Sequence, residues 1–388
     1  MQTTVAKNNQ TVYDRTFIHP FERLAKNDVT TTSIFENEIP SYVEREMDRL
    51  YGNLYSSVSK IRANSNGDMS NVSTYVVYKG AEIVTVFLFC MKYGKVKLLN
   101  EVIEISEEEL NRFITTIFKK FSKVNSISFV AIKTELSQLT YPYQRINYLE
   151  DIIVTLPGSV DQYLASLKKN TRRNIKRYSN RLHTNLPGFS YGVYVKKDID
   201  EQDVRDIIKL NHARMSGKNN ISALGEAETE KMIKLVRECG MICVARNEGK
   251  VCAGAISFRV GENYFLKVLA HDPRYNDYSL GILCCYHIIC ECIKRGGREF
   301  HFLWGRYDYK YTLLGVQRDL DYLAVYRSRI DYAMDFHNVV AIGFNGYLRR
   351  AKLWAQETKR KEGAIPSLVG WSLKRIQEFK KLRMNLAG

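Results

Sequence analysis

The residues best able to move a proton gather in the stretch 271–310 of this 388-residue chain. They are Asp272, His301 and Tyr309. A histidine titrates near neutral pH, and carboxylates and phenols can also act as general acids or bases. Each has a structural alternative: an aspartate before a proline is a common turn former, a histidine at the edge of a core can be satisfied by a carbonyl, and a tyrosine can be a packed ring.

An anion site is predicted where an apolar helix begins at Ser279-Leu280-Gly281. The unpaired N–H groups and the dipole of a helix N-terminus favour a phosphate, and Gly281 lets that phosphate approach the backbone. Arg274 is placed to add a positive charge. Alternatively, Gly281 only allows the helix to pack closely on a sheet, and Ser279 is an N-cap.

A basic helix is predicted from Asp161 to about Arg181, because apolar residues recur there at three- and four-residue steps. Its opposite face carries Lys168, Lys169, Arg172, Arg173, Lys176, Arg177 and Arg181. This excess of charge favours an acidic partner, such as a phosphate-bearing acceptor, a nucleotide sugar or a tRNA acceptor stem, with Arg172, Arg173 and Lys176 as candidate contacts. A solvated helix face that touches lipid headgroups is the alternative.

The elements that must position these residues follow one order twice. In the second half, runs at 251–260 and 263–270 predict a hairpin, a helix follows from Ser279, and a short strand spans 300–304. In the first half, strands are predicted at 74–78, 83–91, 96–102 and 127–132, with a helix that opens at the capping box Ser106 to Glu109. The repeated order predicts an internal duplication.

The second half resembles the acyl-CoA-binding half of the GNAT N-acyltransferase fold, most of all the branch with CelD-like acetyltransferases and FemAB-type aminoacyl transferases. The motifs of that branch correspond to Asp272-Pro273, Ser279-Leu280-Gly281, the strand 301–305 and Tyr309-Lys310, and its basic "K-x-R-x-x-I-R-R" helix corresponds to 167–177. Two positions depart from the pattern. His301 stands where the family has an aspartate, and only Gly281 remains of the loop that binds the CoA pyrophosphate.

The resemblance implies an α/β fold of tandem GNAT-like domains. Residues 1–150 would form a degenerate domain, 151–330 the acyltransferase domain and 331–388 a helical extension, with helices at 331–361 and 372–382. The first copy has an acidic helix start, which would repel a pyrophosphate.

The implied activity is transfer of an acyl group from acyl-CoA to a primary amine on a phosphorylated or saccharide-linked small acceptor. Removing a proton from the amine would fall to His301, protonating the leaving group to Tyr309, and holding the acceptor to Lys310. His212 and Arg214 resemble a family "H-x-R" that faces the acceptor pocket. Two alternatives stay open: a FemAB-type transferase that takes aminoacyl groups from charged tRNA, and an inactive scaffold in polysaccharide or envelope assembly.

The composition of the chain limits the possible fold class, partners and location. The chain is long enough for two cores, its 45% hydrophobic and 26% charged residues are typical of a globular protein, and its net charge of +16 favours an acidic partner. The eight cysteines lack zinc-ribbon spacing and lie mostly in apolar runs, so we expect reduced thiols and no metal. No apolar leader is evident, so we expect a cytoplasmic protein, with a peripheral place at the inner membrane face left open. Motifs of serine hydrolases, P-loop NTPases, Rossmann dehydrogenases and zinc peptidases are missing from the sequence.

Overall fold

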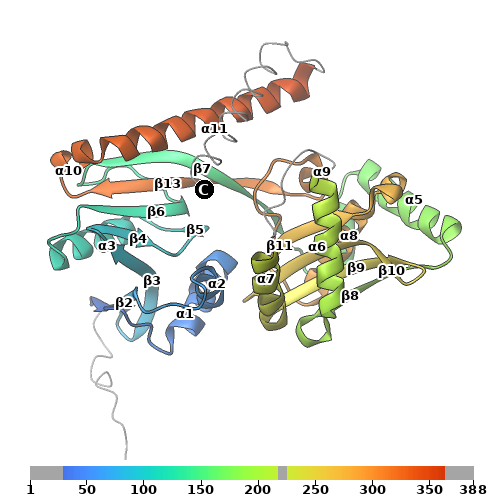
Figure 1. Cartoon of the computed structure of the whole chain (residues 1–388), viewed down its shortest axis with the longest axis horizontal. Coiled ribbons are helices and arrows are strands. Elements are labelled where there is room, and N and C mark those ends of the chain that lie inside the picture. Colours follow the sequence, from blue (N-terminus) through green and yellow to red (C-terminus); the bar gives the residue numbers. More distant parts are fainter. Residues whose placement is uncertain (1–28, 217–224, 363–388) are drawn as a thin grey trace, which may run out of the picture.

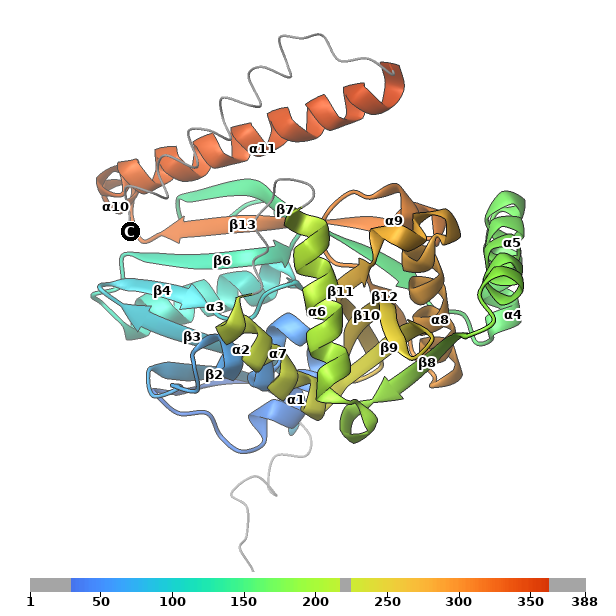
Figure 2. The same ribbon diagram turned by 45° about the vertical axis from the view of Figure 1, so that its right-hand side comes forward.

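A computed structural model describes residues 29–216 and 225–362, and shows one mixed sheet flanked by helices (Figures 1 and 2). The strands of the first half are β1 (Thr30–Phe35), β2 (Val72–Lys79), β3 (Glu82–Lys92), β4 (Lys95–Leu98), β5 (Ile103–Glu104), β6 (Ser126–Lys133) and β7 (Tyr143–Thr155). Those of the second are β8 (Phe189–Val195), β9 (Gly240–Asn247), β10 (Lys250–Val260), β11 (Asn263–His271), β12 (Glu299–His301) and β13 (Val316–Tyr326). The expected α/β fold is confirmed.

The helices complete both halves. They are α1 (Val43–Tyr51), α2 (Val58–Asn64), α3 (Glu107–Lys120), α4 (Val160–Ser166), α5 (Lys169–Asn185), α6 (Glu201–Ser216), α7 (Glu226–Cys239), α8 (Leu280–Lys294), α9 (Asp308–Thr312), α10 (Arg329–Met334) and α11 (Phe336–Glu362). Short 3-10 turns are η1 (Leu54–Ser56), η2 (Lys196–Asp198) and η3 (Pro273–Tyr278). The order strand, two helices, three antiparallel strands, helix, strand occurs in each half, with parallel pairs β4/β6 and β11/β12 at equivalent places.

The two halves exchange their last strands. The sheet order is β1-β2-β3-β4-β6-β13-β7-β12-β11-β10-β9-β8. Thus β7, which follows β6 in the chain, pairs with β12, whereas β13, which follows β12, pairs with β6. The long β7/β13 ladder therefore joins the halves, and the division at residue 150 stays a prediction because each half contains a strand of the other.

Local sequence signals explain several elements. Ser106 accepts from the backbone N–H of Glu109, whose side chain accepts from Ser106 in return, so the predicted capping box is confirmed at the start of α3. The hairpin β10/β11 turns at Gly261, whose φ of 57° a glycine adopts at no steric cost. The same hairpin was expected from the alternating apolar runs.

The helix predicted from Asp161 to Arg181 is wrong in one respect, because the structure has two helices. Leu167 is buried with ψ 145°, an extended conformation that ends α4. Arg172 reaches back from α5, and its Nη1 donates to the carbonyl oxygens of Leu164, Ala165 and Leu167 at 3.3, 2.8 and 2.8 Å. The carbonyl groups at the end of α4 are thereby satisfied, which favours the break.

Two further boundaries differ from expectation. The strand predicted at 300–304 ends at His301, because Leu303 has a φ of 57° that a strand cannot continue. The helix predicted from Asp331 breaks at Asp335, which is held by Lys95 at 2.7 Å and by the side chain of Asn338 at 2.7 Å. The helix predicted at 372–382 lies outside the described residues.

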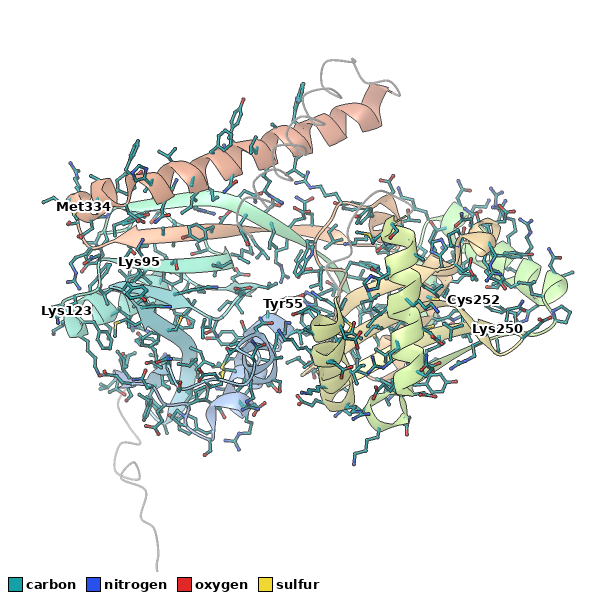
Figure 3. The ribbon with its side chains drawn as sticks, viewed as in Figure 1. Tyr55, Lys95, Lys123, Lys250, Cys252 and Met334 are labelled. Atoms are coloured by element: carbon teal, nitrogen blue, oxygen red, sulfur yellow. The ribbon has the colours of Figure 1, made fainter. Side chains whose placement is uncertain are left out.

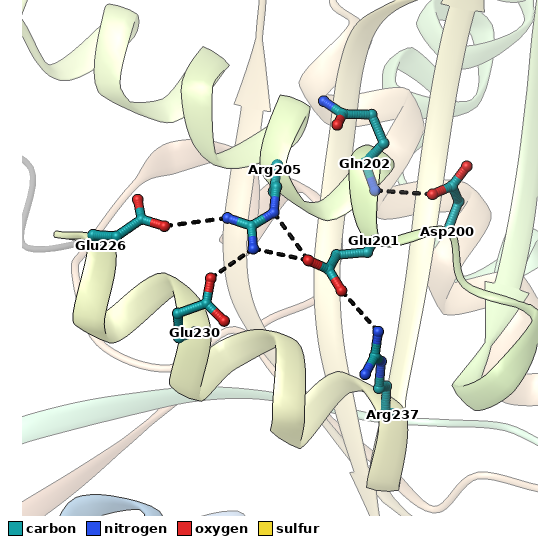
Figure 4. Close-up of polar contacts among 7 residues, drawn as sticks. All are labelled: Asp200, Glu201, Gln202, Arg205, Glu226, Glu230 and Arg237. Carbon is teal, nitrogen blue, oxygen red and sulfur yellow. Dashed lines mark hydrogen bonds and ion pairs between the residues drawn. The ribbon is translucent and has the colours of Figure 1, made fainter.

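Helices cover both faces of the second half. Helix α8 packs on one face with Tyr264, Phe300 and Phe302, while α6 and α7 pack on the other with Phe265 and Val268. Arg205 of α6 binds Glu226 and Glu230 of α7 at 3.2 and 2.6 Å (Figure 4). Glu201 accepts from both Arg205 and Arg237, so the network holds α6 and α7 together (Figure 4).

The part of the chain that the structure describes holds no helix long and apolar enough to cross a membrane. All eight cysteines are free thiols. Within the described ranges, no group of histidine, cysteine and carboxylate side chains is arranged to hold a metal ion.

Candidate functional site

The two parallel strands β11 and β12 separate after a short ladder. They pair only at Asn263↔Glu299, Tyr264↔Phe300 and Phe265↔His301, whereas β11 continues to His271. Beyond His301 the chain turns away through Leu303 and Gly305, with φ of 57° and 94°. The side of β11 that faced β12 therefore has no strand neighbour from residue 266 onward, and backbone groups exposed in this way can pair with an extended ligand.

Lys267 lies at this separation. Because Ile256 pairs with Val268 and Ser257 with Leu266, Lys267 is the extra residue of a β-bulge, a device that redirects a side chain. Its ammonium lies 5.1 Å from the ring of Trp304 and 5.9 Å from that of Tyr55, and these rings are 5.3 Å apart.

The environment of Lys267 tunes its charge. Burial, followed by the positive charge of Lys60, lowers the pKa of Lys267 to about 8. Tyr55 comes from the first half and lies at the junction of the two (Figure 3). No sequence motif includes Lys267, although a lone lysine in the apolar strand 263–271 is a usable signal.

His301 is enclosed by acidic residues. It is 2% exposed, stacks on Phe265 at 4.3 Å, and its Nδ1 lies 2.6 Å from Oδ2 of Asp151. Its Nε2 is 3.3 Å from a carboxylate oxygen of Glu299, an ion-pair distance without the alignment of a hydrogen bond. Burial alone would lower the pKa of His301, but Asp151 and then Glu299 outweigh burial and raise it. Both ring nitrogens face carboxylates, which favours the protonated imidazole and disfavours His301 as a proton acceptor, the role expected from the sequence.

Two buried polar atoms beside this pair have unused hydrogen-bonding capacity. Oη of Tyr55 and Oδ1 of Asp151 have no hydrogen-bond partner among the residues that the structure places. Burial, followed by the negative charge of Asp151, raises the pKa of Tyr55, so the phenol stays protonated and remains a donor. The junction thus contains a donor and an acceptor that are both available to a polar ligand.

The loop after β12 is fixed from two sides. Nζ of Lys310, 3% exposed, donates to the carbonyl oxygens of Phe302, Leu303 and Trp304 at 2.9, 3.0 and 2.7 Å. These bonds use all three N–H groups of the ammonium, which leaves none for the acceptor group that Lys310 was expected to hold. Burial lowers the pKa of Lys310 to about 8.

Glu150 holds the same loop from the sheet. Its carboxylate accepts from the backbone N–H of Gly305 at 3.2 Å and pairs with Arg349 of α11. Arg349 also donates to Asn147 at 3.1 Å. The helical extension thus supports the loop that carries Trp304.

Tyr309 and Arg214, two residues singled out in the sequence, lie close enough for the charge of one to affect the other. Burial raises the pKa of Tyr309, and the nearby positive charge of Arg214 opposes this shift. The ring of Tyr309 packs edge-on against Phe302 at 5.8 Å. His212, two residues before Arg214 in α6, is partly exposed. This corner of the site therefore keeps a protonated phenol beside a guanidinium.

The predicted anion site lies at the start of α8. Ser279 precedes the helix with a φ of 52° and makes no side-chain cap. A Cβ added to Gly281 would meet Nδ1 of His271 at 3.5 Å and Cδ2 of Leu269 at 3.8 Å, which are ordinary contacts. Close packing of the helix on the sheet therefore does not require a glycine at position 281. This favours the other hypothesis, in which Gly281 leaves room for a phosphate at the helix start.

Asp272 and Arg274 bind one another beside this helix start. Asp272 accepts from the backbone N–H of Arg274 at 2.9 Å and from its guanidinium at 2.6 Å. Arg274 holds the pKa of Asp272 below its usual range. These contacts favour the turn-forming alternative for Asp272 over a role as a proton acceptor.

The basic helix α5 lies against the same helix start. Hydrogen bonds that Tyr178 accepts from Ser279, and then from Arg177, lower the pKa of Tyr178. Arg181 lies 5.2 Å from the ring of Tyr278. Arg173 and Lys176 are exposed, whereas Arg172 is engaged with the end of α4. Arg177 and Arg181 therefore lie beside the place where the sequence predicts a phosphate.

Comparison with known proteins agrees with this geometry. Residues 169–311 match the family model described as an acetyltransferase (GNAT) domain. The crystal structure of FemX is similar, with a TM-score of 0.53 and 11% identity over 75% of this chain and 96% of that one.

Weaker similarity extends to other solved structures. L-PGS from Bacillus licheniformis has a TM-score of 0.46 and 13% identity over 81% of this chain and 99% of that one. A tandem GNAT protein from the clavulanic acid biosynthesis pathway has a TM-score of 0.39 and 9% identity over 76% and 98%. No curated protein matches the sequence. Residues 169–311 thus match a GNAT acetyltransferase domain, within a chain whose fold is similar to that of FemX.

Proposed function

We propose that this protein is a GNAT-type N-acyltransferase that moves an acyl group from acyl-CoA to a primary amine of a small, phosphorylated or saccharide-linked acceptor. The observation that carries the proposal is the separation of β11 and β12 after Phe265↔His301. The amides of a pantetheine chain can pair with the backbone that this separation exposes. The start of α8, with Gly281 and the cations of α5, would take the phosphates.

The bulged Lys267 is the base that we propose in place of His301. Because the pKa of Lys267 is about 8, part of the Lys267 side chain is neutral near physiological pH and can accept a proton. The amine nitrogen of the acceptor attacks the thioester carbonyl, so that a C–N bond forms and the C–S bond breaks. Lys267 takes the amine proton, and the phenol of Tyr309 supplies a proton to the departing thiolate.

The binding step can be tested by calorimetry with acetyl-CoA and CoA. Gly281→Glu should weaken binding at least tenfold, because a carboxylate at the start of α8 repels the pyrophosphate. The matched control is Gly225→Glu at the start of α7, where an added Cβ meets nothing within 4 Å. Equal affinity of both variants and the wild type would refute the proposed cofactor site.

The catalytic step can be tested with acetyl-CoA and a panel of amines. Lys267→Met should lower kcat by about 100-fold and remove the rise in rate through about pH 8. Lys250→Met, on an exposed lysine, is the control and should behave as wild type. An unchanged pH profile in Lys267→Met would exclude Lys267 as the base even if acyl transfer itself is confirmed.

A second candidate is transfer of aminoacyl groups from charged tRNA. The observation that favours it is the row of exposed cations on α5, which lies beside the start of α8. Binding to tRNA should weaken steeply with salt, whereas binding to CoA should weaken only slightly. Salt-sensitive binding of charged tRNA without any binding of CoA would replace acyl-CoA by aminoacyl-tRNA as the donor.

A further inference from the structure

Helix α11 presents a row of apolar side chains to solvent. The row, here called the α11 stripe, consists of Phe336, Val340, Phe344, Tyr347 and Trp354, whose exposed fractions are 61, 49, 59, 69 and 62%. Their spacing places them on one face of the helix. Exposed Ile330 and Met334 of α10 extend the stripe at its start, where Figure 3 labels Met334.

The opposite face of α11 fixes this orientation. Val339 is 8% exposed, and its carbonyl accepts from Gln144 of β7 at 2.8 Å. A Cβ added to Gly346 would meet Ile146 at 3.4 Å, so the helix lies close to the sheet there. Because one face of α11 is committed to β7, the exposed stripe points away from the sheet. Helix α11 itself lies along the upper edge of the molecule in Figure 1.

The charged residues along α11 are positive from Phe336 to Gln356. From Phe336 to Gln356 the sequence contains Arg349, Arg350 and Lys352 but no aspartate or glutamate. Arg349 is paired with Glu150, while Arg350 is exposed. The sequence beyond the described residues adds Lys374, Arg375, Lys380, Lys381 and Arg383 against Glu378 alone. An occupant of the stripe must therefore be apolar and carry negative charge.

We propose that the α11 stripe docks on the surface of an anionic lipid bilayer. A helix that lies flat, with aromatic side chains toward the acyl boundary and basic residues at headgroup level, gains from both apolar burial and charge attraction. Phenylalanine, tyrosine and tryptophan suit this interface. A second copy of the chain fits less well, because it would bring the same positive charge against Arg350.

Flotation of the full chain with lipid vesicles tests the proposal. The vesicles are phosphatidylcholine alone, or phosphatidylcholine with about one third phosphatidylglycerol. Wild type should float with the anionic vesicles, less at high salt, and only weakly with the neutral ones. Phe344→Glu and Trp354→Glu should abolish flotation, and Arg350→Gln should weaken it about fivefold.

The control is Tyr191→Glu, which places the same charge on an exposed aromatic residue of β8, the strand at the far edge of the sheet. It should float as wild type does, and unchanged circular dichroism should show that all variants fold. Failure of wild type to float would overturn the proposal, as would flotation that survives Phe344→Glu and Trp354→Glu together. A dimer in solution that Phe344→Glu dissociates, without vesicle binding by wild type, would assign the stripe to a second copy instead.

Discussion

Nδ1 of His301 lies 2.6 Å from Oδ2 of Asp151, although the two residues are 150 positions apart in the chain. Asp151 belongs to β7, the last strand of the first half, and His301 ends β12 of the second. The contact therefore depends on the pairing of β7 with β12. It also ties a histidine that resembled a catalytic base to a carboxylate of β7, and so joins the two halves.

The ion pair between His301 and Glu299 should make stability depend on pH. The pKa of Glu299 falls to about 2, chiefly through His301, so its contribution is present above about pH 4.5 and is lost as pH falls. The pKa of His301 is raised, so its contribution is present below about pH 6.5 and is lost as pH rises through the folded value. Glu299→Gln should therefore cost most, about 1–2 kcal/mol of unfolding free energy, between about pH 5 and 6.5.

Urea unfolding across this pH range measures the effect. Glu104→Gln is the control, because Glu104 forms an exposed ion pair with Lys133 at 3.1 Å and should change stability by less than about 0.5 kcal/mol. A cost of Glu299→Gln that is the same at pH 5.5 and at pH 9 would contradict a charged His301.

The charged form of Lys267 should lower the free energy of unfolding. Its pKa is lowered from 10.5 to about 8, so the folded state disfavours the proton, and stability should rise with pH between these two values. Lys267→Met removes this cost and should raise the unfolding free energy at pH 7 by about 1 kcal/mol, with a smaller gain at pH 10.5. Thermal unfolding at both pH values measures the gain, and a loss of stability at pH 7 would show that the ammonium contributes favourable contacts.

Much of the element order could be predicted, because it depends on local signals. The alternating apolar runs around Gly261 and the capping box at Ser106 each specify a turn or a helix start from a few residues. The strand exchange could not be predicted in this way. The apolar run 316–326 can pair with any strand of matching pattern, and the pairing with β6 depends on contacts with residues almost 200 positions away.

The site was predictable in part for the same reason. Gly281 and Tyr309 were found because their local sequence has a recognisable pattern, whereas the partners of His301 come from β7 and from its own strand. In the sequence, Arg172 is one of seven cations on the predicted helix and is grouped with Arg173 and Lys176 as a candidate contact. The break after α4 gives Arg172 a different, structural role, because its guanidinium binds the end of that helix. Lys267 belongs to no recognised motif, and its only sequence signal is that it is a lysine within an apolar strand.

The strand exchange predicts that β13 stabilises the first half. Leu323 and Val325 of β13 are fully buried with Phe113 and Phe129 of the first half. Leu323→Ala should cost about 2–5 kcal/mol and lower the melting temperature of the whole chain. Val316→Ala, at the exposed start of the same strand, should cost less than about 0.5 kcal/mol. Calorimetry that shows two transitions, with only the second shifted by Leu323→Ala, would contradict the exchange.

Arg172 should stabilise the fold, whereas its neighbours Arg173 and Lys176 on α5 should affect only the binding of a polyanion. Arg172→Gln removes three hydrogen bonds to the end of α4 and should lower the unfolding free energy by about 1 kcal/mol. Arg173→Gln and Lys176→Gln alter exposed side chains and should leave stability unchanged within about 0.5 kcal/mol. If a polyanion such as tRNA binds α5, each of these two should instead reduce the slope of log affinity against log salt by about one.

Filter binding with tRNA over a salt series, together with urea unfolding, separates these effects. Arg172→Gln should lower stability and leave the slope of log affinity against log salt unchanged. Lys176→Gln should leave stability unchanged and reduce that slope. Equal slopes for all three variants and the wild type would mean that α5 makes no phosphate contacts, since each phosphate contact contributes about 0.7–0.9 to the slope. The donor would then have to be recognised at the start of α8 alone, which favours a CoA thioester over a charged tRNA.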